Sequence, residues 1–142
     1  MVFASDEWAQ AFRAEIEDSA TYRKAAASWR HGPIALVVRS APAVGVPAPV
    51  ALWLDIQSGR CRAAKLVSER EAAAAPFCIT GEYRDWKSVI RRELDPVKAI
   101  VSRKLLLRGS LFTLLRYVPA AMELVGSAQR VRTEFADEAT GS

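Results

Sequence analysis

Apolar side chains near the N-terminus recur at the spacing of a helix. Trp8, Phe12 and Ile16 are four residues apart, so they share one face of a helix. The hydroxyl of Ser5 is suited to cap the start of this helix, and two acidic residues that follow it complement the positive end of the helix dipole. The pattern predicts one helix that continues until just before His31, with its charged face outward.

Short apolar runs in the middle of the chain alternate in the way that strands do. Val50, Leu52, Leu54 and Ile56 share one face by two-residue alternation, and this face is expected to meet the core. A turn at residues 57–59 makes this strand the first half of a hairpin. The predicted strands are residues 34–38, 50–56, 60–67, 77–80 and 104–108.

Further helices are predicted between and after these strands. A short helix begins at Ser68, another covers residues 83–94, and the Asp-Pro sequence at 95–96 begins a third. The final helix begins at Leu111, and Pro119 is expected to kink or break it near Val118. Its broad apolar face consists of Leu111, Leu114, Leu115, Val118, Met122 and Val125. The order of elements predicts an α+β fold with a mostly antiparallel sheet.

Length and composition fit one domain with its own core. The chain has 142 residues, of which 51% are hydrophobic and 25% charged, so it needs neither metal nor disulfide to fold. The two cysteines stand in apolar runs and are expected to be small buried side chains in a reducing compartment. We predict a single domain over residues 1–131. Residues 132–142 are small and polar, and we predict a disordered tail there.

Charge and targeting signals limit the kinds of partner and the cellular compartment that are expected. The formal charge of +4 favours acidic partners such as lipid head groups, and a transient contact with an anionic membrane surface is one expectation. Acids and bases alternate along most of the chain, so no nucleic-acid partner is expected. The acidic N-terminus is unlike a secretion signal and no apolar run is long enough to cross a bilayer, which predicts a cytoplasmic protein.

The chain carries few of the groups that catalysis needs. His31 is the single histidine, and motifs for nucleotide, nucleophile or metal sites are absent. We therefore predict no enzyme, no catalytic residue, no metal and no cofactor. The weakest alternative is a small enzyme acting on an acyl or isoprenoid substrate, with Asp55 or Tyr83 as the acid or base.

Residues 94–111 resemble the signature of the sterol carrier protein 2 family. The sequence LDPVKAIVSRKLLLRGSL follows that family's pattern of Asp-Pro, helix, a GKLKIKGD-like strand and an apolar helix. The resemblance in layout covers roughly Trp8 to Gln129. Arg103 departs from the pattern, because the family commonly has glycine there, and the final helix is longer and interrupted by proline.

The resemblance implies a five-stranded sheet covered by helices, with an apolar tunnel between them that takes sterols, fatty acids, acyl-CoA or phospholipids. By position, the tunnel would be lined or closed by Val97, Ile100, Val101, Leu105, Leu107, Leu111, Leu114, Leu115 and Val118. Met122, on the same apolar face of the final helix, joins this candidate set. Arg116 and Tyr117 are candidate contacts for the head group.

The leading hypothesis is an intracellular lipid-binding or lipid-transfer protein that holds a small apolar ligand. Burial of ligand methylenes, at about 0.8 kcal/mol each, would supply the affinity. The alternative is a non-catalytic interaction or dimerisation module that uses the apolar face of the C-terminal helix, because an exposed leucine-rich face also requires burial. This alternative leaves a homodimer possible.

Overall fold

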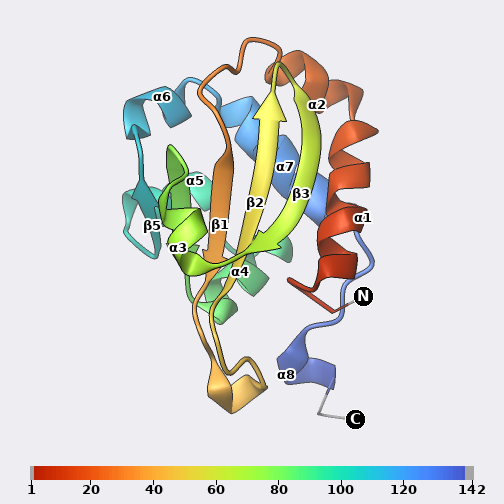
Figure 1. Cartoon of the computed structure of the whole chain (residues 1–142), viewed down its shortest axis with the longest axis vertical. Helices are drawn as coiled ribbons and strands as arrows, with labels where there is room; N and C mark the ends of the chain where they lie inside the picture. Colours follow the sequence, from red (N-terminus) through yellow and green to blue (C-terminus); the bar gives the residue numbers. More distant parts are fainter. Residues whose placement is uncertain (1, 140–142) are drawn as a thin grey trace.

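The alternating runs in the middle of the chain form one sheet. In the computed structural model, which describes residues 2–139, the strands are β1 (Ile34–Val38), β2 (Val50–Gln57), β3 (Arg60–Val67), β4 (Phe77–Gly81) and β5 (Leu105–Arg108). Their order in the five-stranded sheet is β3-β2-β1-β4-β5 (Figure 1). β1 and β4 run parallel, whereas the other neighbours run antiparallel. The predicted α+β fold with a mostly antiparallel sheet is confirmed.

The register of the strands gathers large apolar side chains on one face of the sheet. Leu36 of β1 pairs with Leu52 of β2 and with Ile79 of β4. Since side chains two residues apart point the same way, Leu54 and Ile56 share this face, and both are buried. The predicted inward face of the hairpin is confirmed.

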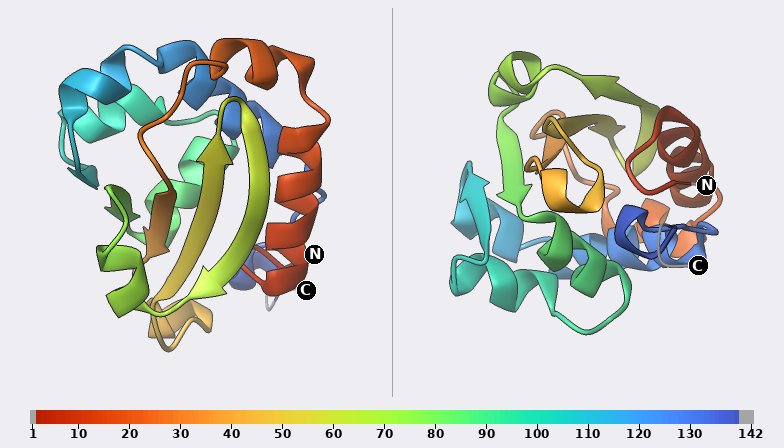
Figure 2. Two further views of the ribbon diagram at one scale, coloured as in Figure 1. Left: turned by 45° about the horizontal axis from the view of Figure 1, so that its top comes forward. Right: turned by 90° about the horizontal axis from the view of Figure 1, so that it is seen from below.

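Helices cover one face of the sheet and part of the other. The apolar face is covered by α1 (Asp6–Glu17), α4 (Tyr83–Ile90), α5 (Pro96–Val101) and α7 (Val118–Arg130), and α1 follows β3 at one edge (Figures 1 and 2). On the opposite face, the short helix α3 (Glu69–Ala73) packs small side chains against part of β1 and β2. The main core lies between the sheet and the helices on its apolar face.

The predicted N-terminal helix is divided in two. α1 ends at Glu17, and α2 (Ala20–Ala25) begins after a new cap at Ser19. The Ser19 hydroxyl accepts a hydrogen bond from the backbone N–H of Tyr22, which satisfies one of the free donors at a helix start. The second helix can then turn its Tyr22 into the core at a different angle from the first.

The last residue of α1 fixes that helix to the edge of the sheet. Glu17 accepts hydrogen bonds from Arg60 Nε (3.0 Å) and Nη2 (2.7 Å), and from the backbone N–H of Cys61 (2.6 Å). The hydrogen bonds from Arg60 lower the pKa of the Glu17 carboxyl from its ordinary value of 4.5, and these bonds, together with the one from Cys61, outweigh the opposite effect of burial.

We expect Glu17→Gln to destabilise the protein by about 1–2 kcal/mol near pH 7, because two charge-assisted hydrogen bonds are lost. The pKa of Glu17 is lower in the folded protein than in the unfolded chain. The carboxylate therefore contributes its full stabilisation at pH values above the unfolded pKa, and this stabilisation is lost as the pH falls through the folded pKa. Urea unfolding should therefore show a difference in the free energy of unfolding between wild type and Glu17→Gln that is smaller at about pH 3 than at about pH 7. The control is Glu93→Gln, which replaces an exposed acid. A stability difference between wild type and Glu17→Gln that stays constant with pH would contradict this account.

Two arginines adopt the left-handed backbone conformation where helices end. Arg92 (φ 62°) follows α4, which is shorter than the predicted 83–94 helix, and Arg103 (φ 65°) follows α5. A left-handed residue is the usual way to stop a helix, and glycine is the residue that adopts it at least cost. Arg103 thus stands where a glycine would be favoured, and the chain still turns there into β5.

The final helix is interrupted as predicted. α6 (Leu111–Leu115) and α7 are separated by Arg116 and Tyr117, and Pro119 lies in the first turn of α7, where its missing N–H costs nothing. The expected break near Val118 is confirmed.

The stretch after α7 differs from the predicted disordered tail. It forms a bridge between Glu134 and Val2, then the short helix α8 (Ala136–Ala139). Phe135 is 4% exposed and packs on Phe3 and Tyr83. One aromatic anchor therefore orders a segment that is otherwise small and polar; residues 140–142 lie outside the described residues.

Candidate functional site

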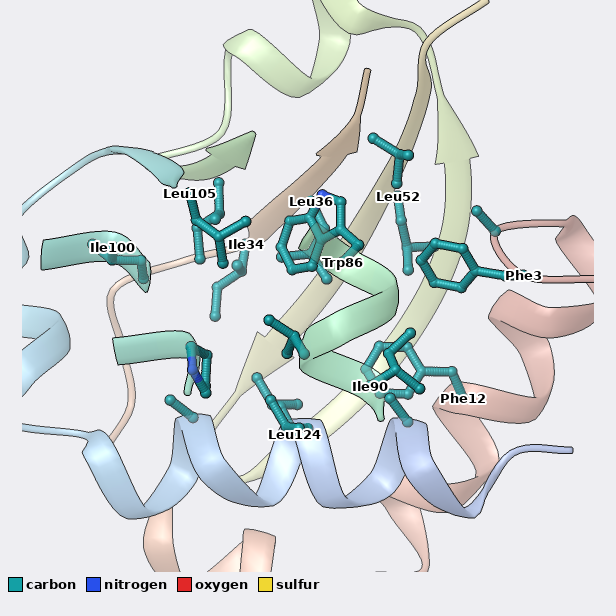
Figure 3. Close-up of a pocket in the computed structure, with 18 of the residues that line it drawn as sticks. Phe3, Phe12, Ile34, Leu36, Leu52, Trp86, Ile90, Ile100, Leu105 and Leu124 are labelled. Carbon is teal, nitrogen blue, oxygen red and sulfur yellow. The ribbon is translucent and has the colours of Figure 1, made fainter. Parts of the chain in front are cut away.

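An apolar cavity lies between the sheet and the helix layer. Its volume is about 130 Å³. In Figure 3, Leu36 and Leu52 point into it from the strands, and Trp86, Ile90 and Leu124 from the helices. The lining residues are Phe3, Ala4, Trp8, Phe12, Ile34, Leu36, Val38, Val50, Leu52, Phe77, Ile79, Trp86, Val89, Ile90, Pro96, Val97, Ile100, Leu105, Leu114, Ala121, Leu124, Val125 and Ala128.

Local periodicity explains how residues far apart in sequence line one space. Strands present every second residue, so β1 contributes Ile34, Leu36 and Val38. Helices present residues three and four apart, so α7 contributes Ala121 and Leu124, with Val125 and Ala128 beside them. The sheet therefore supplies branched side chains, and α7 supplies two small ones that leave room.

The lining of the cavity is carbon almost throughout. The two tryptophans that reach it have their polar atoms bonded elsewhere: Trp86 Nε1 donates to the carbonyl of Val37 (3.0 Å), and Trp8 Nε1 donates to Thr133 Oγ1 (2.8 Å). Both rings consequently offer only apolar surface to the cavity. An occupant of this space would be held by exclusion from water and by packing.

A polar groove adjoins the cavity. Val89, Pro96 and Val125 line both spaces. On the groove side, Arg92 Nε donates to Gln129 Oε1 (2.5 Å), and Arg130 donates to the carboxylates of Glu15 and Glu123. Three side chains thus separate an apolar interior from a surface that carries fixed charges.

The two arginines of the groove differ in their partners: Arg130 is paired with acidic side chains and Arg92 is bonded to an amide. Glu123 accepts from Arg130 Nη2 (2.8 Å) and from the Ser19 hydroxyl (2.9 Å). Burial alone would raise the pKa of Glu123, but these two bonds lower it below its ordinary value. Arg130 is accordingly paired with carboxylates, whereas Arg92 donates to a neutral amide.

The structure brings part of the predicted set together at this cavity. Val97, Ile100, Leu105 and Leu114 line it. Leu107 packs against the main core from β5, and Val118 is half-buried at the start of α7. The remaining apolar members are exposed: Val101, Leu111, Leu115 and Met122, of which Met122 lines the adjoining groove.

The two candidate head-group contacts lie away from the cavity. Arg116 is exposed at the break between α6 and α7. Tyr117 is buried, its ring packs on Trp29, and its hydroxyl lies 3.0 Å from the Ser28 hydroxyl. Neither residue lines the cavity or the groove.

Sequence reasoning did not assign the N-terminal, strand and α4 residues to the site. Trp8, Phe12 and Leu52 were expected in the core, and they are buried, but their second role as cavity wall was not inferred. The alternation of β1 and β2 and the apolar stripe of α4 are the signals that place them on the correct face. Nothing in those signals distinguishes a filled core from a hollow one.

The two residues considered for catalysis, Tyr83 and Asp55, are engaged in structural contacts, and Cys61 is buried as expected. Burial raises the pKa of the Cys61 thiol to about 12, which disfavours the reactive thiolate. The Tyr83 hydroxyl accepts from the backbone N–H of Ala136 (2.8 Å), and Asp55 pairs with Arg62. Over residues 2–139, no group of His, Cys, Asp and Glu is arranged to hold a metal. Within the same range, none of the helices has the length and apolar character to span a membrane.

This α+β fold has counterparts among known proteins. The chain matches the model of the SCP-2 sterol transfer family over residues 9–121. A crystal structure of sterol carrier protein 2 is 39% identical, covers 91% of this chain and 98% of its own, and superposes with a TM-score of 0.84. A conserved hypothetical protein of Thermus thermophilus is 38% identical, with coverages of 94% and 92% and a TM-score of 0.83.

A more distant structure shares the fold alone. Sterol Carrier Protein-2 from Aedes aegypti, in complex with the C16 fatty acid palmitate, is 14% identical, with coverages of 89% and 98% and a TM-score of 0.50. A search of curated proteins gave no match. The family match spans most of the chain, so this protein belongs to the SCP-2 sterol transfer family, and the resemblance seen in residues 94–111 is confirmed.

Proposed function

We propose that this protein is a lipid carrier that holds an apolar chain in the cavity between its sheet and α7. The observation that supports the proposal most is a carbon-lined cavity in a member of a sterol transfer family. Natural interiors leave few voids, because a void of this size is costly. A cavity that no polar group enters is suited to a hydrocarbon chain.

The size of the cavity bears on the kind of lipid. A space of roughly 150 Å³ accommodates a benzene molecule, so about 130 Å³ holds only part of a long alkyl chain. The remainder of a longer ligand requires that the wall move outward. The wall includes two very short helices, α5 and α6, which are the parts most easily displaced. A flexible chain, as in a fatty acid, an acyl-CoA or a phospholipid, meets this requirement with less rearrangement than a rigid sterol.

A polar head group would occupy the adjoining groove. The cavity offers it no hydrogen-bond partner, whereas Arg92 stands just beyond the shared wall of Val89, Pro96 and Val125. An arginine that is bonded to an amide can exchange that partner for a carboxylate or a phosphate. We therefore assign the head-group contact to Arg92 rather than to Arg116 or Tyr117.

Three further features of the carrier belong to this proposal. It acts without catalysis and without a cofactor, it works in the cytoplasm, and it exchanges its ligand with an anionic membrane surface. The positive net charge supports the last of these. The competing interaction module would need the apolar face of the C-terminal helix, but Leu114 and Val125 of that face line the cavity.

A titration of the protein with fatty acids of increasing length, followed by tryptophan fluorescence, tests the proposal. Trp8 and Trp86 line the cavity and should report its filling. We expect saturable binding that tightens by roughly tenfold for each two added methylenes, until the chain outgrows the space. Matched fatty alcohols should bind more weakly, and Arg92→Gln should reduce that difference.

Arg84→Gln, an exposed arginine on α4, is the control and should behave as wild type. Native mass spectrometry of the purified protein, followed by extraction of what leaves with it, identifies the natural ligand class. Absence of saturable binding for fatty acids, acyl-CoA, phospholipids and sterols alike would contradict a carrier function. The interaction module would then be the better explanation.

A further inference from the structure

The net positive charge of the chain comes from one segment. Residues 96–122 contain five Lys and Arg and no Asp or Glu, which leaves fifteen Lys and Arg against sixteen Asp and Glu in the rest of the chain. The five cations are Lys98, Arg103, Lys104, Arg108 and Arg116, and all are exposed. Arg108 donates to the carbonyls of Ala72 and Ala75. None of the five forms an ion pair within residues 2–139.

The same segment exposes large apolar side chains beside these cations. Phe112 is 76% exposed and Val101 is 63% exposed, and Leu106, Leu111 and Leu115 are also exposed. α5, β5 and α6 lie together at the edge of the sheet that ends in β5 (Figures 1 and 2). We call this surface, formed by α5, β5 and α6, the basic face.

The basic face is also a wall of the cavity. Ile100 lines the cavity (Figure 3), whereas its neighbour Val101 is exposed. The same alternation occurs in β5, where Leu105 lines the cavity and Leu106 is exposed on the opposite face of the sheet. It recurs in α6, where Leu114 reaches the cavity and the next residue is exposed. Only one layer of short elements therefore separates the cavity from this surface.

We propose that the basic face docks on an anionic lipid bilayer, with Phe112 entering the head-group region, and that ligand passes between bilayer and cavity through the α5–α6 wall. The proposal rests on the proposed lipid-carrier function. Exposed apolar side chains flanked by Lys and Arg are the combination that binds anionic interfaces. A second copy of the chain is disfavoured as the occupant, because two basic faces would repel each other.

Binding to vesicles tests the docking. Vesicles of phosphatidylcholine with about a third phosphatidylglycerol should sediment the wild-type protein, and pure phosphatidylcholine vesicles should not. Lys98→Glu/Lys104→Glu should weaken the anionic binding by about tenfold or more. The matched control, Lys24→Glu/Lys65→Glu, makes the same charge change on exposed residues of α2 and β3 and should bind nearly as wild type. Phe112→Ser should also weaken vesicle binding without altering the net charge.

Fatty-acid titration of the same variants separates this proposal from the carrier function. Loss of vesicle binding with unchanged fatty-acid affinity supports docking through the basic face, and so does slower transfer of a fluorescent fatty acid between anionic vesicles. An equal loss of vesicle binding in the two charge-reversal variants would overturn the proposal. Wild-type protein that binds no better to vesicles with phosphatidylglycerol, or that forms dimers through this face, would overturn it as well. If the protein binds anionic vesicles but takes up no fatty acid, the docking proposal is supported and the carrier function is refuted.

Discussion

Ala121→Phe is expected to weaken lipid binding strongly while the protein remains folded. Ala121 lies on α7 and its side chain lines the cavity. Since a space of roughly 150 Å³ takes one benzene ring, a phenyl group would fill most of a cavity of about 130 Å³. Excluding two or three methylenes of ligand, at about 0.8 kcal/mol each, weakens binding by at least about tenfold. A fatty-acid titration of the variant measures the effect.

The folded state should tolerate this ring better than it tolerates overpacking elsewhere. Most core positions have no space for an added ring, so such changes commonly cost about 1–3 kcal/mol. At Ala121 the ring enters existing space, and we expect an unfolding midpoint at or above that of wild type. Ala14→Phe, on the exposed side of α1, is the matched control and should bind lipid normally. Unchanged lipid affinity in Ala121→Phe would show that ligand binds elsewhere.

Phe135→Ala is expected to destabilise the protein by about 3–5 kcal/mol, as truncation of a buried phenylalanine usually does. The Phe135 ring packs on Phe3 and Tyr83, and the cations of Lys87 and Arg91 lie over it at 5.4 and 5.1 Å. Its loss should release the segment of residues 132–139 as well. Urea unfolding measures the first effect, and limited proteolysis measures the second.

Glu138→Gln distinguishes the aromatic anchor from the surface charges beside it. Glu138 pairs with Lys87 (3.0 Å) and with Arg91, and exposed ion pairs of this kind contribute little. We expect this variant to unfold nearly as wild type does. A Phe135→Ala variant that loses less than about 1 kcal/mol would mean that the C-terminal segment contributes nothing to the fold.

The strands were predictable because their signals are local. Two-residue alternation in Val50 to Ile56, and a β-branched run at residues 34–38, each specify a strand without reference to the rest of the chain. The break before Pro119 was predictable for the same reason, since proline acts on its own helical turn. The division between α1 and α2 was missed, because both sides of Ser19 continue the apolar pattern.

The cavity and the ordered C-terminal segment depend on contacts between distant residues. The cavity exists because Leu36 and Leu124, from a strand and a helix nearly ninety residues apart, fail to meet, and no local pattern records a gap. Phe135 stands alone in a small and polar stretch, so composition predicted disorder there, whereas its partners come from the N-terminus and α4. Four of the twelve candidate site residues line the cavity, and each belongs to the segment that resembles the family or to the helix that follows it.

The parallel pairing of β1 with β4 has a consequence for folding during synthesis. β1 is the central strand, and β2 covers one of its edges through a local antiparallel connection. Its other edge stays unpaired until β4 has left the ribosome, because the parallel partner follows the whole hairpin and α3. Uncovered strand edges invite pairing with other chains. The nascent protein therefore passes through an interval in which its most apolar strand is open to aggregation, and a chaperone that binds extended apolar segments would act there.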